Sequence, residues 1–118
     1  MSAYAWVALG ALIGAPLRFM VEYRAMRRRS VTDFPRGLFA VNVVGSALAG
    51  IVVGTTDGTL RLFLLVGFCG AFTTFSGFGW ASGQLWHENR RVFWITVLGM
   101  TAACISAFLL TWSATQLW

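Results

Sequence analysis

The sequence predicts an all-α membrane protein with four transmembrane helices, the third of them broken in mid-membrane. The first observation is composition, because 58% of the 118 residues are hydrophobic and only 11% are charged, which is typical of membrane proteins. The second is that four long apolar segments alternate with short polar ones. The third is the stretch 67–79, whose glycines and hydroxyls interrupt the third apolar segment and favour irregular or very closely packed backbone.

Each apolar segment is long enough to cross a bilayer as a helix. At 1.5 Å per residue, about 20 residues cross a hydrocarbon core about 30 Å thick. The connections leave no room for an extramembrane domain, so we expect residues 1–118 to form one transmembrane domain. The predicted spans are 4–23, 37–55, 62–86 and 92–115.

The first span contains a charge that needs an explanation. Its apolar run is too long, and its start too poor in basic residues, for a cleavable signal peptide. Arg18 lies about two-thirds along it. Such a residue either extends to the interface or faces an aqueous vestibule, where it would attract anions.

The second span is uncharged and contains a single amide, Asn42, followed one turn later by Ser46. An asparagine amide offers two donors and one acceptor. It either joins helices through hydrogen bonds or lines a polar path.

In the third span, Phe75 and Phe78 are three residues apart and share a helix face. Such pairs are often core packing. Alternatively, their positive ring edges can favour a small anion without a fixed charge. Ser76, and Ser106 in the fourth span, would supply hydroxyl donors beside these rings.

Small residues recur four apart in several spans, so helix backbones can approach closely. Pairs such as Gly10 and Gly14 are typical of close packing between helices of one chain. The large number of such pairs in so short a chain also suggests packing against a second subunit. The two cysteines, Cys69 and Cys104, lie in apolar segments without disulfide or metal-site spacing.

The charge pattern excludes several classes of protein. The net charge of +5 comes from arginines that flank the spans, which favours a role in topology over nucleic-acid binding. No carboxylate lies in the middle of a span, as proton-coupled transport normally needs. The sequence contains no nucleophile–base pair, metal-ligand spacing or phosphate loop, so we do not expect an enzyme.

The arginines are strongly biased to one side of the predicted membrane. The loops 24–36 and 87–91 hold seven of them, and Arg61 stands alone on the other side. By the positive-inside rule both loops face the cytoplasm of a multi-pass plasma-membrane protein. These loops are also suited to contact anionic membrane lipid.

Three motifs in order resemble the small bacterial fluoride channels of the Fluc (CrcB) family. They are Gly14-Ala15-Pro16-Leu17-Arg18-Phe19 with the preceding Gly10, Val41-Asn42-Val43-Val44-Gly45-Ser46, and the stretch from Gly67 to Ser76. The resemblance extends over nearly the whole chain. It implies a channel domain that exports fluoride passively and forms an antiparallel dimer.

The resemblance also implies roles for individual residues. Asn42, Phe75 and Phe78 match the lining of the fluoride path, and Arg18 matches the vestibule arginine. Ser106 matches the family's polar position in the fourth helix, and Ser76 closes the third matching motif beside the rings of the fluoride path. A structural Na⁺ ion, which is not transported, would be bound by the backbone carbonyls of Gly70 and Thr73.

The chain departs from the family pattern where hydroxyls and a carboxylate are usual, at Gly77, Gly79 and Ala81. Together with the arginine bias, which predicts a single orientation, this favours an antiparallel heterodimer with a paralogue over a homodimer. A milder alternative is a mainly structural subunit of such a channel. A small multidrug exporter fits less well, because Glu22 lies at the end of its span rather than inside it.

Overall fold

In the computed structural model, which describes residues 2–27, 30 and 32–117, four apolar helical spans confirm the predicted class. The third span is interrupted, as predicted. The second span differs from the predicted bounds by one residue at its start, and the other three extend one to four residues beyond them at each end. The elements are α1 (Ala3–Met26), α2 (Arg36–Thr55), α3 (Gly58–Arg61), η1 (Leu62–Cys69), α4 (Gly70–Phe72), α5 (Phe75–Glu88), α6 (Arg90–Trp94), η2 (Ile95–Gly99) and α7 (Met100–Gln116), with η1 and η2 π-helical.

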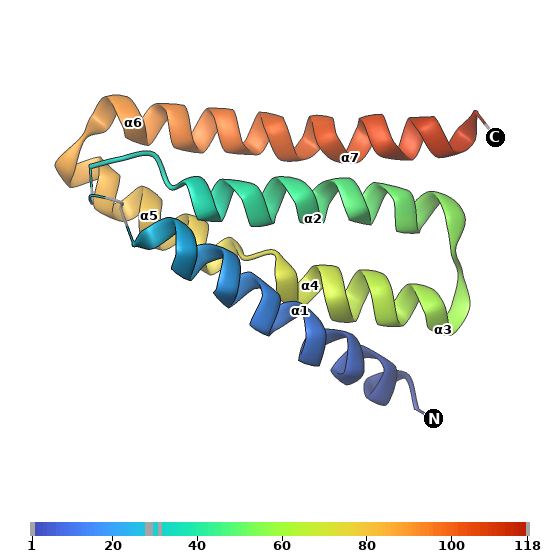
Figure 1. Cartoon of the computed structure of the whole chain (residues 1–118). Coiled ribbons are helices and arrows are strands. Elements are labelled where there is room, and N and C mark those ends of the chain that lie inside the picture. The colour runs from blue at the N-terminus through green and yellow to red at the C-terminus, as the bar shows by residue number, and fades with distance from the viewer. Residues whose placement is uncertain (1, 28–29, 31, 118) are drawn as a thin grey trace.

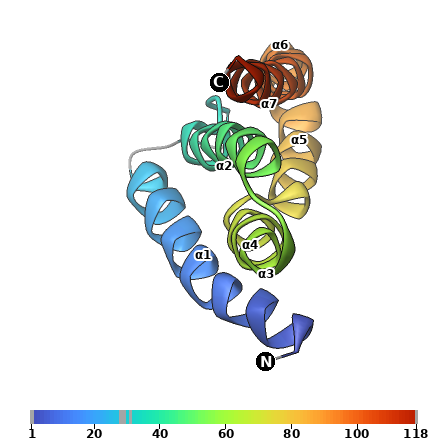
Figure 2. The same ribbon diagram turned by 90° about the vertical axis from the view of Figure 1, so that its right-hand side faces the viewer.

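The spans alternate in direction, as Figure 1 shows. Helix α2 packs along α7 on one side of the molecule, and α1 packs obliquely along η1 and α4 on the other. Viewed from the end in Figure 2, α1 and α7 lie on opposite sides of α2. Both chain ends and the α2–α3 turn lie at one end of the bundle, and the other two connections at the opposite end.

The connection between α2 and α3 is tighter than the predicted loop 56–61. Only Thr56 and Asp57 separate the helices, because Gly58 adopts a positive φ of 57° and starts the next helix at once. Arg61 Nη2 donates to the carbonyls of Val53, at 3.0 Å, and Thr56. This cation therefore neutralises the C-terminus of α2.

At the other end, Asn89 alone separates α5 from α6. Its Oδ1 accepts from the N–H of Val92 at 3.3 Å and caps α6, and its Nδ2 donates to the Thr32 carbonyl at 3.5 Å. The guanidinium of Arg90 lies 4.2 Å from the ring centre of Trp86. The described arginines of both basic loops share this end, and Arg28 and Arg29 lie outside the described residues.

Glycines bring α1 into backbone contact with η1. A Cβ atom on Gly10 would lie 2.2 Å from the Phe63 carbonyl oxygen, and one on Gly67 would lie 2.5 Å from that of Val7. Gly14 makes a similar approach to Phe68. The predicted small-residue packing is confirmed here, because only glycine allows backbones this close.

Candidate functional site

The break in the third span is a two-residue extended segment. Helix α4 ends at Phe72, Thr73 has φ −85° and ψ 161°, and Thr74 has φ −148° and ψ 120° before α5 begins at Phe75. Thr74 is the N-cap of α5, since its Oγ1 accepts from the N–H of Gly77 at 3.0 Å. A threonine cap of this kind favours a helix start at this point over a continuous helix.

Asn42 on α2 joins this break directly. Its Oδ1 accepts from the N–H of Thr74 at 2.8 Å, and its Nδ2 donates to the Thr74 carbonyl at 3.2 Å. Nδ2 also lies 3.6 Å from Met100 Sδ on α7. The side chain therefore links three spans while only 8% of the residue is exposed.

A cavity of about 340 Å³, which we call the break pocket, opens beside Asn42. It brings together three residues predicted for the fluoride path, Asn42, Phe75 and Phe78. Thr73, predicted as a sodium ligand, and Ser46, one turn along α2 from Asn42, also line it. Of the described residues that line it, none is charged. They are Asn42, Ser46, Thr73, Thr74, Phe75, Phe78, Met100, Thr101, Cys104 and Ile105.

The two phenylalanine rings form the edge of the break pocket. Their centroids are 5.9 Å apart with an interplanar angle of 37°. Phe75 is 85% exposed in the single chain. The pocket is therefore open on this side, and a second chain would be needed to enclose a path along the rings.

The two predicted serines lie outside the break pocket. Ser76 Oγ is 3.2 Å from Thr74 Oγ1 and is exposed, and Ser106 is on an exposed part of α7. The polar side chains that α7 does contribute are Thr101 and Cys104. Sequence reasoning missed their role, although their spacing of three places them on one helix face.

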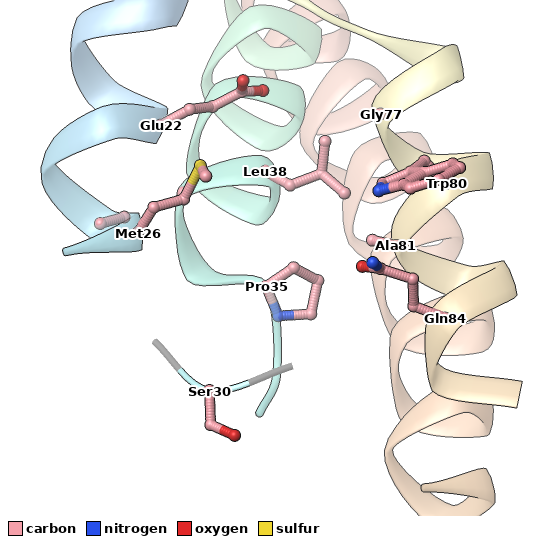
Figure 3. A pocket seen from close by; sticks show the side chains of 11 residues that line it. Glu22, Met26, Ser30, Pro35, Leu38, Gly77, Trp80, Ala81 and Gln84 are labelled. Atoms are coloured by element: carbon pink, nitrogen blue, oxygen red, sulfur yellow. The ribbon is translucent and has the colours of Figure 1, made fainter. Parts of the chain in front are cut away.

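A second cavity of about 360 Å³, the end pocket, lies between the end of α1, the start of α2 and α5 (Figure 3). Glu22 and Met26 approach it from α1, Leu38 from α2, and Trp80 and Gln84 from α5. Gly77 and Ala81, two of the positions that depart from the family pattern, also line it. Arg18 is half-buried one turn before Glu22 and does not line either pocket.

The break also leaves backbone carbonyls without their usual donors. In a continuous helix the N–H groups of Thr74 and Gly77 would bond to the carbonyls of Gly70 and Thr73. Here Asn42 Oδ1 takes the first N–H and Thr74 Oγ1 takes the second. Oxygen donors of this kind fit a hard cation such as Na⁺.

The break places two helix termini with partial charges of opposite sign next to each other. Carbonyls at the end of α4 carry partial negative charge and favour a cation, whereas the N-terminus of α5 carries partial positive charge and favours an anion. Both termini lie in the middle of a 31-residue span. The break therefore places partial charges of opposite sign close together, and none of the described residues that line the break pocket is charged.

Comparison with known proteins places most of the chain within one family. The family model for CrcB-like protein, Camphor Resistance (CrcB), matches residues 5–115. The chain is 35% identical to the fluoride-specific ion channel FluC of Koribacter versatilis over 113 residues, covering 90% of this chain and 89% of the relative. It is 39% identical to FluC 1 of Listeria innocua over 107 residues, covering 87% and 89%. For FluC 1 of Streptomyces avermitilis the identity is 33% over 119 residues, covering 95% of each.

Proposed function

The chain belongs to the CrcB-like family and is a multi-pass membrane protein, and we propose that it is a fluoride-specific ion channel that lets fluoride leave the cytoplasm passively. This role needs no enzymatic chemistry. The observation that carries the proposal is the break pocket, where the N-terminus of α5 meets the rings of Phe75 and Phe78 beside Asn42.

The lining of the break pocket suits a small anion. Ring edges and a helix N-terminus both offer partial positive charge. Without a fixed cation among the described lining residues, an anion is attracted but can still leave, as conduction requires. A proton-coupled exporter is not favoured, because no carboxylate lines this pocket within the described part of the chain.

The proposed cofactor is a structural Na⁺ ion at the carbonyls of Gly70 and Thr73. Gly70 is exposed in the single chain, and a Cβ there would approach only the Leu65 oxygen, at 3.8 Å. Two carbonyls are too few for a hard cation, so a second chain would supply the others. When bound, the ion would offset the partial negative charge of these carbonyls.

The proposed assembly is an antiparallel dimer, with a paralogue favoured as the second chain. The exposed ring of Phe75 and the open side of Gly70 both support a partner at the break. The arginine bias supports one orientation for this chain, with loops 24–36 and 87–91 in the cytoplasm. A mainly structural role within the same heterodimer remains the second candidate, because Gly77, Gly79 and Ala81 lack polar side chains.

Fluoride efflux from proteoliposomes tests the function. With sodium present, the chain purified with its paralogue is expected to release fluoride rapidly and to retain chloride. The chain alone is expected to stay near the background of empty liposomes. Equal release of fluoride and chloride would contradict the proposed selectivity. If the paired proteins released no fluoride above background, the proposed channel function itself would be contradicted.

Replacing Phe78 with leucine is expected to lower fluoride efflux by roughly fivefold, because an aromatic edge contact is worth about 1 kcal/mol. The same change at Phe63 is the matched control, since that ring packs edge-on against Trp6 outside both pockets. The measurement is the initial efflux rate per reconstituted protein. Equal efflux rates in the two variants would show that Phe78 does not line the ion path.

A further inference from the structure

Asn42 uses both polar atoms of its amide on the backbone of the break. The acceptor atom binds the N–H of Thr74 at 2.8 Å, and the donor atom binds the carbonyl of the same residue at 3.2 Å. Burial excludes most water from the side chain. In such surroundings an unpaired backbone N–H costs free energy, so the N–H of Thr74 must find an acceptor. The side-chain oxygen of Asn42 therefore decides which hydrogen bond this N–H makes.

Helix α2 is packed tightly enough to keep this amide in place. Gly45, on the turn after Asn42, approaches the break so closely that a Cβ atom would lie 2.2 Å from Thr73 Cγ2. On the other side, Met100 is 1% exposed and its sulfur accepts from Asn42 Nδ2 at 3.6 Å. The amide is thus fixed between α2, the break and α7.

The hydrogen bond from Thr74 has a consequence for the residue four positions earlier. The N–H of Thr74 donates its hydrogen bond to Asn42. In a continuous helix the same N–H would donate to the carbonyl of Gly70. If the acceptor were lost, the cheapest repair would be to extend α4 by one bond and return that N–H to Gly70. That hydrogen bond would occupy one lone pair of the carbonyl and turn its oxygen along the helix axis, which weakens its binding of a cation.

We propose that Asn42 is a positioning residue for the cation site: by holding the N–H of Thr74, its side chain keeps the Gly70 carbonyl available for sodium. This proposal rests on the proposed function, and specifically on its sodium site. Asn42 lines the break pocket as well, so one side chain connects the cation site to the anion path.

The test measures the rise in unfolding temperature that sodium produces in the chain purified with its paralogue, with choline as the replacement cation. The wild type is expected to show a rise that saturates with sodium. In Asn42→Ala the rise is expected to disappear or to need at least about tenfold more sodium, a loss of roughly 1.4 kcal/mol in binding. Ser46→Ala is the matched control, because it removes a polar group from the same pocket and helix and leaves both amide bonds intact.

A second control separates positioning from general stability. Gly10→Ala lowers stability at the contact between α1 and η1 and removes none of the hydrogen bonds of Asn42 and Thr74, so its unfolding temperature should fall while its sodium response persists. If Asn42→Ala cannot be obtained folded, Asn42→Leu replaces it, because leucine has a shape close to that of asparagine but offers no acceptor oxygen. A folded Asn42→Leu protein without a sodium response supports the proposal, and one with the wild-type midpoint overturns it.

Two further outcomes would overturn the proposal. One is a wild type whose unfolding temperature does not depend on sodium. The other is an Asn42→Ala protein whose unfolding temperature responds to sodium with the same midpoint concentration as the wild type. Fluoride efflux is measured in parallel on the paired wild-type proteins. Efflux together with an unchanged midpoint in Asn42→Ala refutes the positioning role alone. The expected sodium responses without fluoride efflux refute the channel function and leave the positioning role standing.

Discussion

Gly10→Ala is expected to destabilise the protein by about 3 kcal/mol, at the upper end of the cost of overpacking. The added methyl group would lie 2.2 Å from the carbonyl oxygen of Phe63 and 2.7 Å from the backbone nitrogen of Phe68. Neither atom can move as a side chain would, so α1 must separate from η1. The measurement is the free energy of unfolding in mixed detergent and denaturant, or the unfolding temperature.

The matched control for this prediction is Gly99→Ala in the fourth span. A Cβ atom at Gly99 would meet nothing within 4 Å, and alanine is a better helix former by about 1 kcal/mol. Gly99→Ala should therefore be neutral or slightly stabilising. If both variants unfolded alike, the contact between α1 and η1 would not be the source of the effect.

Rebalancing the arginines is expected to change the orientation of the chain from single to mixed. Replacing Arg27, Arg28 and Arg29 with serine, and Asp57 and Thr59 with arginine, leaves four arginines at the basic end against three at the other. Loop charges of this kind set the direction of insertion. The wild type should insert with its C-terminus outside, and the rebalanced chain in both directions.

A C-terminal reporter that is active on only one side of the membrane measures this orientation. Lysine at the three positions 27–29 is the control, because it keeps the charge and should keep the single orientation. Comparable amounts of both orientations in the wild type would refute the arginine argument. The preference for a heterodimer would then lose its main support.

The sequence was sufficient for the features that depend on local composition. Long uncharged segments can be buried only in lipid or protein, so the four spans could be predicted before any contact was known. The break was predictable for a similar reason, because glycines and hydroxyls weaken a helix wherever they gather. The exact end of each span was less predictable. The turn at Gly58 and the single-residue link at Asn89 depend on a backbone angle and a cap.

The contacts of the site required the tertiary structure. Asn42 and Thr74 are 32 residues apart, and the spacing of residues within one span does not show which atom of another span a side chain will meet. The same limit explains why Thr101 and Cys104 of α7, and not Ser106, line the break pocket. Rotation of a helix about its axis is set by its neighbours, and α7 packs against α2 along its length.

By itself, then, the sequence determined that this chain crosses the membrane four times, that its third helix breaks, and that most of its arginines lie at one end. Each of these follows from the free energy of placing given residues in hydrocarbon, which hardly depends on the partners of each residue. Only the tertiary structure decided which side chain holds the break open. That depends on hydrogen bonds between spans, and a directional bond exists only when packing has brought its two atoms together.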